Sequence, residues 1–155
     1  MVIVRKVKMC EIQELVRFII KHGLADDLKS SEDEYYIFKN NNIICGYGMM
    51  ERHKDFCIIK NVFVNEENRG TKYGSAIVKT MLNSAELGGA ATAICLSQNE
   101  NFSLSLNFKP LNVKEVPNHI KPFIIDKAKL RNVYSVSLID YFKNACDGCK
   151  DKIST

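Results

Sequence analysis

Hydrophobic and polar residues alternate in short runs along the first part of the chain, as expected for half-buried strands. The first run covers residues 2–7. Residues 35–38 and 43–51 are separated by the turn sequence Asn-Asn-Asn at 40–42, so they predict a β-hairpin. Residues 56–64 form another apolar run rich in β-branched side chains. The pattern therefore predicts an antiparallel meander of at least three strands.

Two other stretches repeat hydrophobic residues at helical spacing. Residues 10–22 predict an amphipathic helix with acids in its first turn, bases in its last turn and Gly23 just beyond. Residues 75–87 carry a second apolar stripe, which Gly88-Gly89 ends. Residues 90–96 then predict a strand parallel to the one before this helix, because a strand-helix-strand unit gives parallel pairing.

The rest of the chain completes the fold prediction. Residues 102–108 predict a short helix or an irregular strand, residues 111–123 a long crossing loop, and residues 133–139 a last strand. We expect an α/β fold with a mixed, mostly antiparallel sheet of six or seven strands and helices on both faces. Residues 1–142 are expected to form a single domain, followed by a polar tail over residues 143–155.

Composition and charge narrow the class of protein. A chain of 155 residues with 46% hydrophobic residues is long enough to bury a core, which excludes disorder as its main state. Its longest uncharged stretch, residues 87–99, is too short to span a membrane, and the charged N-terminus does not resemble a secretory signal. We expect a cytoplasmic protein with no membrane partner. A net charge of +4 without long runs of like charge argues against nucleic acid but allows a local site for an anionic coenzyme.

Six cysteines raise the question of thiol or metal chemistry. Cys45, Cys57 and Cys95 invite a thiol-nucleophile reading, but each lies in an apolar run with no histidine expected beside it, so we interpret them as packing residues. Cys146 and Cys149 have C-x-x-C spacing, but the sequence offers no second ligand pair to complete a structural zinc site. A redox dithiol normally lies at the start of a helix, whereas these cysteines lie in the polar tail. No metal site is expected.

The most informative segment is V-F-V-N-E-E-N-R-G-T-K-Y-G-S-A at residues 62–76. A strand that ends in a tight loop and leads at once into a helix presents backbone N–H groups to an anion such as a diphosphate. Arg69 adds a bidentate contact and Lys72 a point charge. The alternative interpretation is an ordinary strand-to-helix turn with solvated Arg and Lys.

These residues, with F-S-L-S-L-N-F-K-P at 102–110, resemble the GNAT superfamily of N-acetyltransferases over residues 2–140. The family's loop pattern [QR]-x-x-G-x-[GA] falls on residues 69–74. Segments near residue 22 and over residues 96–117 are similar to the N-acetylglutamate synthase branch. The resemblance implies transfer of an acetyl group from acetyl-CoA, as co-substrate, to a primary amine, with an amino acid or another small amine as the favoured acceptor.

The resemblance also implies where the coenzyme binds. Loop amides would hold its pyrophosphate, and main chain of the preceding strand would pair with the pantetheine arm. From the sequence itself, Asn99 is a further candidate for that arm, against the alternative that it is only a polar loop residue. The candidate coenzyme-binding residues are Val62, Val64, Arg69, Gly70, Thr71, Lys72, Tyr73, Gly74, Ser75 and Asn99.

Four positions depart from the family pattern. Lys72 stands where the family usually has its first loop glycine, and Asn107 replaces the glycine of a terminal G-F step, a mild change because Asn tolerates the left-handed region. Ser103 stands where many members carry a Tyr acid, although a hydroxyl is a poorer acid than a phenol. Ile58 takes the place of a Glu that the synthase branch often has.

The catalytic candidates follow from the need for a neutral amine, since some group must accept its proton. Glu51 and His53 are the nearest by topology, and we choose Glu51 as the base against the alternative that both are solvated turn residues. Tyr134 is a candidate proton donor unless it only packs, and Ser103 stays a candidate acid.

An acyl-CoA-binding regulatory module with little catalysis remains the alternative function. A homodimer is the default expectation for assembly.

Overall fold

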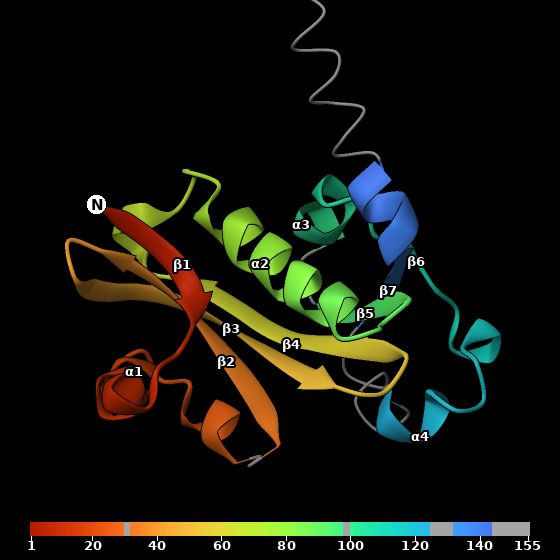
Figure 1. The fold of residues 1–155 in the computed structure, drawn as a ribbon, viewed down its shortest axis with the longest axis horizontal. Helices are drawn as coiled ribbons and strands as arrows, with labels where there is room; N and C mark the ends of the chain where they lie inside the picture. Colours follow the sequence, from red (N-terminus) through yellow and green to blue (C-terminus); the bar gives the residue numbers. More distant parts are fainter. Residues whose placement is uncertain (30–31, 98–99, 125–131, 144–155) are drawn as a thin grey trace, which may run out of the picture.

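The computed structural model describes residues 1–29, 32–97, 100–124 and 132–143. Within them lies a seven-stranded sheet in the order β1-β2-β3-β4-β5-β7-β6, which confirms the predicted mixed sheet (Figure 1). Neighbouring strands are antiparallel except β4 and β5, which are parallel as predicted. The strands are β1 (Val2–Lys6), β2 (Asp33–Asn40), β3 (Ile43–Arg52), β4 (Phe56–Val64), β5 (Thr92–Ser97), β6 (Lys109–Pro110) and β7 (Asn132–Ser137).

The α-helices are α1 (Ile12–Lys21), α2 (Tyr73–Leu87), α3 (Glu100–Ser105) and α4 (Lys121–Ile124). Short 3₁₀ turns occupy Met9–Glu11 (η1), Ala25–Leu28 (η2), Glu66–Asn68 (η3) and Val113–Glu115 (η4). In the described ranges we find no helix with both the length and the apolar character that crossing a membrane requires.

Helices cover both faces of the sheet, as predicted: α2 lies on one face, and α1 and α4 lie on the other (Figure 1). The alternation of β2 divides its side chains, with Phe38 in the core under α2 and Ile37 in the core under α1. Gly48 of β3 sets how closely α2 approaches. A Cβ atom there would lie 2.6 Å from Ile77 Cγ2 and 2.7 Å from Met81 Cε.

The turn between β2 and β3 explains why the hairpin forms where the sequence predicts it. Asn41 and Asn42 have φ values of 51° and 68°, so both adopt the left-handed conformation that a two-residue hairpin turn favours. Asparagine tolerates this region better than other non-glycine residues because its short side chain bonds locally. Gly23, with φ 74°, likewise follows the end of α1 at the predicted position.

Two expectations for the C-terminal part were wrong. The last strand ends at Ser137 instead of residue 139, and residues 138–143 are helical, with Leu138 and Tyr141 buried in the core under α2. Their i, i+3 spacing places both on one helix face. The expected crossing loop also contains α4, whose Ile124 packs with Val116 in the second core of the opposite face. The tail from residue 144, with Cys146 and Cys149, lies outside the described residues.

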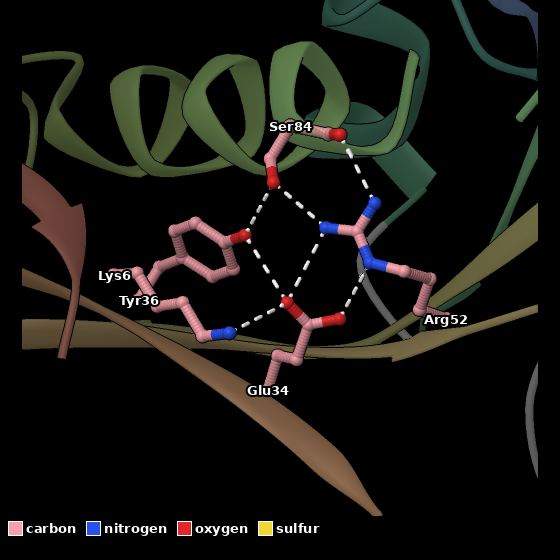
Figure 2. A network of polar contacts seen from close by, with 5 residues as sticks. All are labelled: Lys6, Glu34, Tyr36, Arg52 and Ser84. Atoms are coloured by element: carbon pink, nitrogen blue, oxygen red, sulfur yellow. Dashed lines mark hydrogen bonds and ion pairs between the residues drawn. The ribbon is translucent and has the colours of Figure 1, made fainter. Parts of the chain in front are cut away.

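A polar network fixes the C-terminal half of α2 to the sheet (Figure 2). The guanidinium of Arg52 in β3 donates through Nε to Glu34 Oε2 at 2.7 Å and through Nη1 to the Ser84 carbonyl at 3.0 Å. Lys6 of β1 pairs with Glu34 at 3.2 Å, and the Tyr36 hydroxyl contacts Ser84 Oγ at 2.8 Å. Three strands and one helix therefore share a single charged cluster.

This network favours the ionised form of Glu34. Burial alone would raise the pKa of its carboxyl, but hydrogen bonds from Arg52 and Lys6 outweigh burial and hold the pKa below its ordinary value. A lowered folded-state pKa stabilises the fold fully above the unfolded pKa, and the stabilisation is lost as pH falls through the folded pKa.

We therefore predict that Glu34→Gln lowers the free energy of unfolding by about 1 to 3 kcal/mol at pH 7, because it leaves Arg52 and Lys6 without their charged partner. The difference from the wild type should shrink as pH falls below about 4.3, where the unfolded carboxyl binds a proton. Urea unfolding at several pH values measures both. The control is Glu86→Gln, the same charge change on an exposed position of α2; equal loss in both variants would contradict the prediction.

Candidate active site

The site begins where strands β4 and β5 part. The two strands pair from Phe56 with Thr92 to Ile59 with Cys95, and no register continues beyond that pair. At the same point β4 carries a bulge, since Met49 of β3 faces Asn61 whereas Met50 faces Ile59, which leaves Lys60 as the extra residue. The bulge bends β4 away from β5 and opens a gap between two parallel strands.

This gap widens into a cavity of about 590 Å³. We call the end at Ile59 and Cys95, where the pairing of the two strands stops, the closed end; the other end lies at the loop before α2. The lining residues are Ile59, Lys60, Asn61, Val62, Val64, Asn68, Arg69, Gly70, Lys72, Tyr73, Gly74, Ser75, Cys95, Leu96 and Phe102.

Most of the predicted coenzyme-binding residues therefore line one cavity. Val62, Val64 and the loop residues 69–75 do so except Thr71, whose hydroxyl donates to the Asn68 carbonyl and holds the loop's shape. Asn99 lies outside the described residues.

The start of α2 presents free backbone amides to this cavity. The first amide that bonds back within the helix is Ala76 N–H, to the Lys72 carbonyl at 3.1 Å, so the N–H groups of Tyr73, Gly74 and Ser75 have no intrahelical partner. Lys72, the N-cap residue, provides no side-chain cap and has φ 65°. It thus adopts the left-handed conformation that the family's glycine would supply, while adding a positive charge.

Arg69 connects this loop to the end of β4. Its Nε donates to the Val64 carbonyl at 2.9 Å, and its guanidinium carbon lies 5.4 Å from the Phe63 ring centroid. These contacts fix the side chain through Nε and leave the two Nη groups for an anion. On the other side of the loop, a Cβ at Gly74 would lie 3.3 Å from the Phe102 ring, so the glycine lets α3 approach α2 closely.

Glu51 and His53 lie beside the closed end of the cavity. Glu51 Oε2 is 2.8 Å from His53 Nε2, and Glu51 Oε1 is 3.2 Å from the Nζ of Lys60, a lining residue. The Glu51 side chain is 13% exposed, so it is not a solvated turn residue. Burial would raise its pKa, but the hydrogen bonds with His53 and Lys60 outweigh burial and lower it. The carboxylate is therefore ionised at neutral pH.

The other two catalytic candidates lie away from the cavity lining. Tyr134 is buried in β7, where it pairs with Cys95 and packs in the core under α2. Ser103 is 1% exposed and its Oγ has no hydrogen-bond partner in the structure, whereas its neighbour Phe102 lines the cavity. Asn107, just after α3, has φ 66°, so it does adopt the left-handed conformation expected of it.

A polar cluster that the sequence pattern does not predict lies next to Lys60 and Asn61. The Oδ2 atom of Asp27 accepts hydrogen bonds from the Tyr47 hydroxyl at 2.5 Å and from Asn61 Nδ2 at 2.6 Å. The Tyr35 hydroxyl donates to the Asp27 carbonyl. Burial and the bond to Asp27 raise the pKa of Tyr47 far above its ordinary value, which keeps its proton in place as the donor. The one signal in the sequence was Lys-Asn in the middle of an apolar strand.

Asp33 completes this cluster at the start of β2. Its side chain is 1% exposed, and its Oδ1 lies 2.8 Å from Lys60 Nζ. Neither carboxylate oxygen meets the geometry of a hydrogen bond in the structure, so Asp33 is held by the ion pair of its Oδ1 with Lys60, and its Oδ2 has no hydrogen-bond partner. A buried carboxylate with an unsatisfied oxygen is rare, because its desolvation is costly.

Cys45, Cys57 and Cys95 are buried in the core under α2, as expected for packing residues. Cys57 is fully buried between β3 and β5, and burial raises the pKa of its thiol to about 12. Cys45 lies in the same core, and Cys95 is 9% exposed at the closed end of the cavity. Cys10 is exposed. A thiolate nucleophile at Cys57 is therefore excluded at neutral pH.

The sheet, its parted parallel strands and the amide-lined loop together define an acyl-coenzyme A transferase fold. Residues 9–103 match the model of the Acetyltransferase (GNAT) family, so the chain belongs to this family, whose co-substrate is acetyl-CoA. No curated protein matches the sequence.

Three solved structures illustrate the likeness. N-acetylglutamate synthase from Neisseria gonorrhoeae, complexed with coenzyme A and N-acetyl-glutamate, has a TM-score of 0.68 at 15% identity over 89% of this chain and 35% of its own. For a GNAT acetyltransferase from Staphylococcus aureus Mu50, the TM-score is 0.68 and the sequence identity is 14%, and the match covers 89% of this chain and 99% of that protein. For the ribosomal-protein-S18-alanine N-acetyltransferase from Escherichia coli, the TM-score is 0.63 and the sequence identity is 11%, and the match covers 89% of this chain and 94% of that protein. The chain thus spans about a third of the synthase but nearly the whole of the other two.

The burial of Cys57 gives a direct prediction. Iodoacetamide at pH 8 should alkylate Cys10 in the folded protein and leave Cys57 unmodified until denaturant is added, because roughly 10⁻⁴ of a thiol with a pKa near 12 is ionised at that pH. Peptide mass spectrometry before and after unfolding locates the labels. Rapid labelling of native Cys57 would reopen the thiol-nucleophile hypothesis.

Proposed function

We propose that this protein transfers the acetyl group of acetyl-CoA to a primary amine of a small molecule. The observation that carries the proposal is the cavity between β4 and β5, which has a helix N-terminus at one end and Lys60 at the other, where the Lys60 ammonium pairs with the buried carboxylate of Glu51. Acetyl-CoA supplies an activated acetyl thioester to such a site. The residues present fit this co-substrate along the whole length of the cavity.

At the loop end, the charge and the donors suit a diphosphate. The free amides of Tyr73, Gly74 and Ser75 would donate to the anion, and the positive end of the α2 dipole adds to their effect. Lys72 contributes a point charge and Arg69 its two Nη groups. Between the ends, the backbone of β4 beyond Ile59 no longer pairs with β5, so its amide and carbonyl groups at Val62 can bind the amide-rich pantetheine arm.

At the closed end, Glu51 and His53 form the unit that accepts the proton of the acceptor amine. The ionised carboxylate lies 2.8 Å from the imidazole, so a proton taken at Glu51 can pass to His53. The His53 ring packs against the rings of Phe56 and Phe123, with centroid distances of 4.4 and 4.2 Å, and these contacts limit the movement of the imidazole beside Glu51. Positioning of the amine and the thioester supplies the remaining acceleration.

For coenzyme binding, we predict that replacing Arg69 and Lys72 together by Ala weakens CoA affinity by about 2 to 4 kcal/mol, because two charge-assisted contacts with the diphosphate are lost. Isothermal calorimetry measures the change, and an unaltered melting temperature shows that the variant is folded. Lys79→Ala, an exposed lysine further along α2, is the matched control. Equal CoA affinity in the double variant and the control would refute the loop as the diphosphate site.

For catalysis, we predict that Glu51→Gln lowers kcat by roughly 10²-fold or more and leaves CoA affinity unchanged. Ser103→Ala should cost less than about tenfold, because a CoA thiolate, with a pKa near that of a free thiol at about 8.5, leaves with modest help. Steady-state thiol release from acetyl-CoA measures both. The opposite ranking would make Ser103 the acid and Glu51 a bystander. Tight CoA binding with no turnover of any amine would favour the binding-module function.

A further inference from the structure

The polar side chains at the closed end of the cavity form one cluster on the α1 face of the sheet. We call Asp27, Asp33, Glu51, Lys60 and Asn61 the acceptor-side cluster. Lys60 and Asn61 line the cavity, and each is bonded to carboxylates behind it: Lys60 to Asp33 and Glu51, Asn61 to Asp27. The three carboxylates do not line the cavity themselves but lie behind Lys60 and Asn61, on the side of the sheet opposite α2, so an acceptor at this end would reach them past these two side chains.

The charges of this cluster do not balance. Lys60 Nζ bridges Asp33 and Glu51 at 2.8 and 3.2 Å, so one ammonium faces two carboxylates. Asp27 is held by neutral donors, the Tyr47 hydroxyl and the Asn61 amide, which orient the carboxylate without cancelling its charge. Within the described ranges, the cluster thus contains three carboxylates and a single ammonium.

Asp33 adds a second, independent sign that a ligand completes the cluster. Its carboxylate is buried, it faces the Nζ of the cavity-lining Lys60, and its Oδ2 has no hydrogen-bond donor in the structure. An unsatisfied buried carboxylate oxygen in a cluster with excess negative charge favours a cationic donor over a neutral or anionic one. The ion pair between Lys60 and Asp33 Oδ1 shows that this carboxylate can bind an ammonium group.

The two ends of the cavity therefore carry opposite charge. Arg69 and Lys72 make the loop end positive, and the acceptor-side cluster makes the closed end negative. In a partly buried site these charges interact more strongly than they would on the open surface. An acceptor with a carboxylate next to its amine would be repelled, because its negative charge would lie near the three carboxylates of the cluster.

We propose that the acceptor is a small diamine or polyamine, in which one amine is acetylated and a second ammonium is held by Asp27 and Asp33. This inference rests on the proposed acetyl transfer and names its substrate class. The reacting nitrogen loses a proton to Glu51 and attacks the thioester carbonyl with its lone pair. The carbon–sulfur bond breaks and the sulfur leaves with the bonding electrons as thiolate. The attacking nitrogen gives up its second proton to solvent as it becomes a neutral amide, the thiolate takes a proton from solvent, and the second ammonium stays unchanged.

The test compares acceptors that differ in one group. Thiol release from acetyl-CoA is measured with 1,4-diaminobutane, with butylamine, which lacks the second ammonium, and with glutamate, which adds carboxylates. We expect kcat/KM for the diamine to exceed that for butylamine by roughly tenfold or more, with glutamate lowest. The KM for the diamine should rise with ionic strength more steeply than that for butylamine.

Substitutions in the cluster test whether it causes the preference for the diamine over butylamine. Asp27→Asn should raise the KM for 1,4-diaminobutane roughly tenfold more than it raises the KM for butylamine, because only the diamine carries a second ammonium. Asp26→Asn, the same change on the adjacent, exposed residue that pairs with Lys29, should have no effect. Asp27→Glu should restore part of the preference, because it returns the charge.

Several outcomes overturn the inference. It fails if butylamine or glutamate is acetylated as efficiently as the diamine, or if Asp27→Asn and Asp26→Asn behave alike. The comparison of acceptors and of salt dependence needs only the wild-type protein, so it decides even where Asp27→Asn does not fold. Acetylation of monoamines or amino acids alone would leave the proposed function standing without this inference. Absence of thiol release with every amine, despite measured CoA binding, would remove both.

Discussion

The parting of β4 and β5 is the constraint on which the rest of the structure depends. Two parallel strands in the middle of a sheet normally satisfy each other's backbone groups along their whole length. Here the extra residue Lys60 ends that pairing after Ile59, so polar backbone on one strand faces a cavity instead of a neighbour. A ligand rich in amides is the natural partner for such an edge. The loop, the helix α2 and the polar cluster are all arranged around this opening.

Much of the fold could be predicted because its signals are local. Alternation gave the meander β2-β3-β4, helical spacing gave α1 and α2, and the loop 69–75 was recognisable from glycine placement and charge. In each case the information lies within about fifteen residues, over which periodicity and turn chemistry are strong. The helix at 138–143 was not predicted because it is only six residues long. Its first apolar residues directly continue the apolar run of the preceding strand, so the pattern shows no boundary between the two.

The acceptor side of the site could not be predicted for a different reason. Asp27, Tyr47 and Asn61 come from a loop and two strands, and only the sheet register brings them together. The bulge at Lys60 determines which face these side chains occupy, because one inserted residue reverses the alternation after it. Nothing in the sequence of β4 marks that insertion. Glu51 could be proposed from topology alone, whereas its contacts with Lys60 and His53 appear only in three dimensions.

The way α2 is attached to the sheet has a consequence for ligand binding. Its middle rests on Gly48, and its C-terminal half is bonded to Arg52 through Ser84, so the direction in which the helix points is set when the chain folds (Figures 1 and 2). The conformational entropy of orienting the free amides at Tyr73 to Ser75 is then a cost of folding and not of association. What an incoming coenzyme still has to give up is its own torsional freedom.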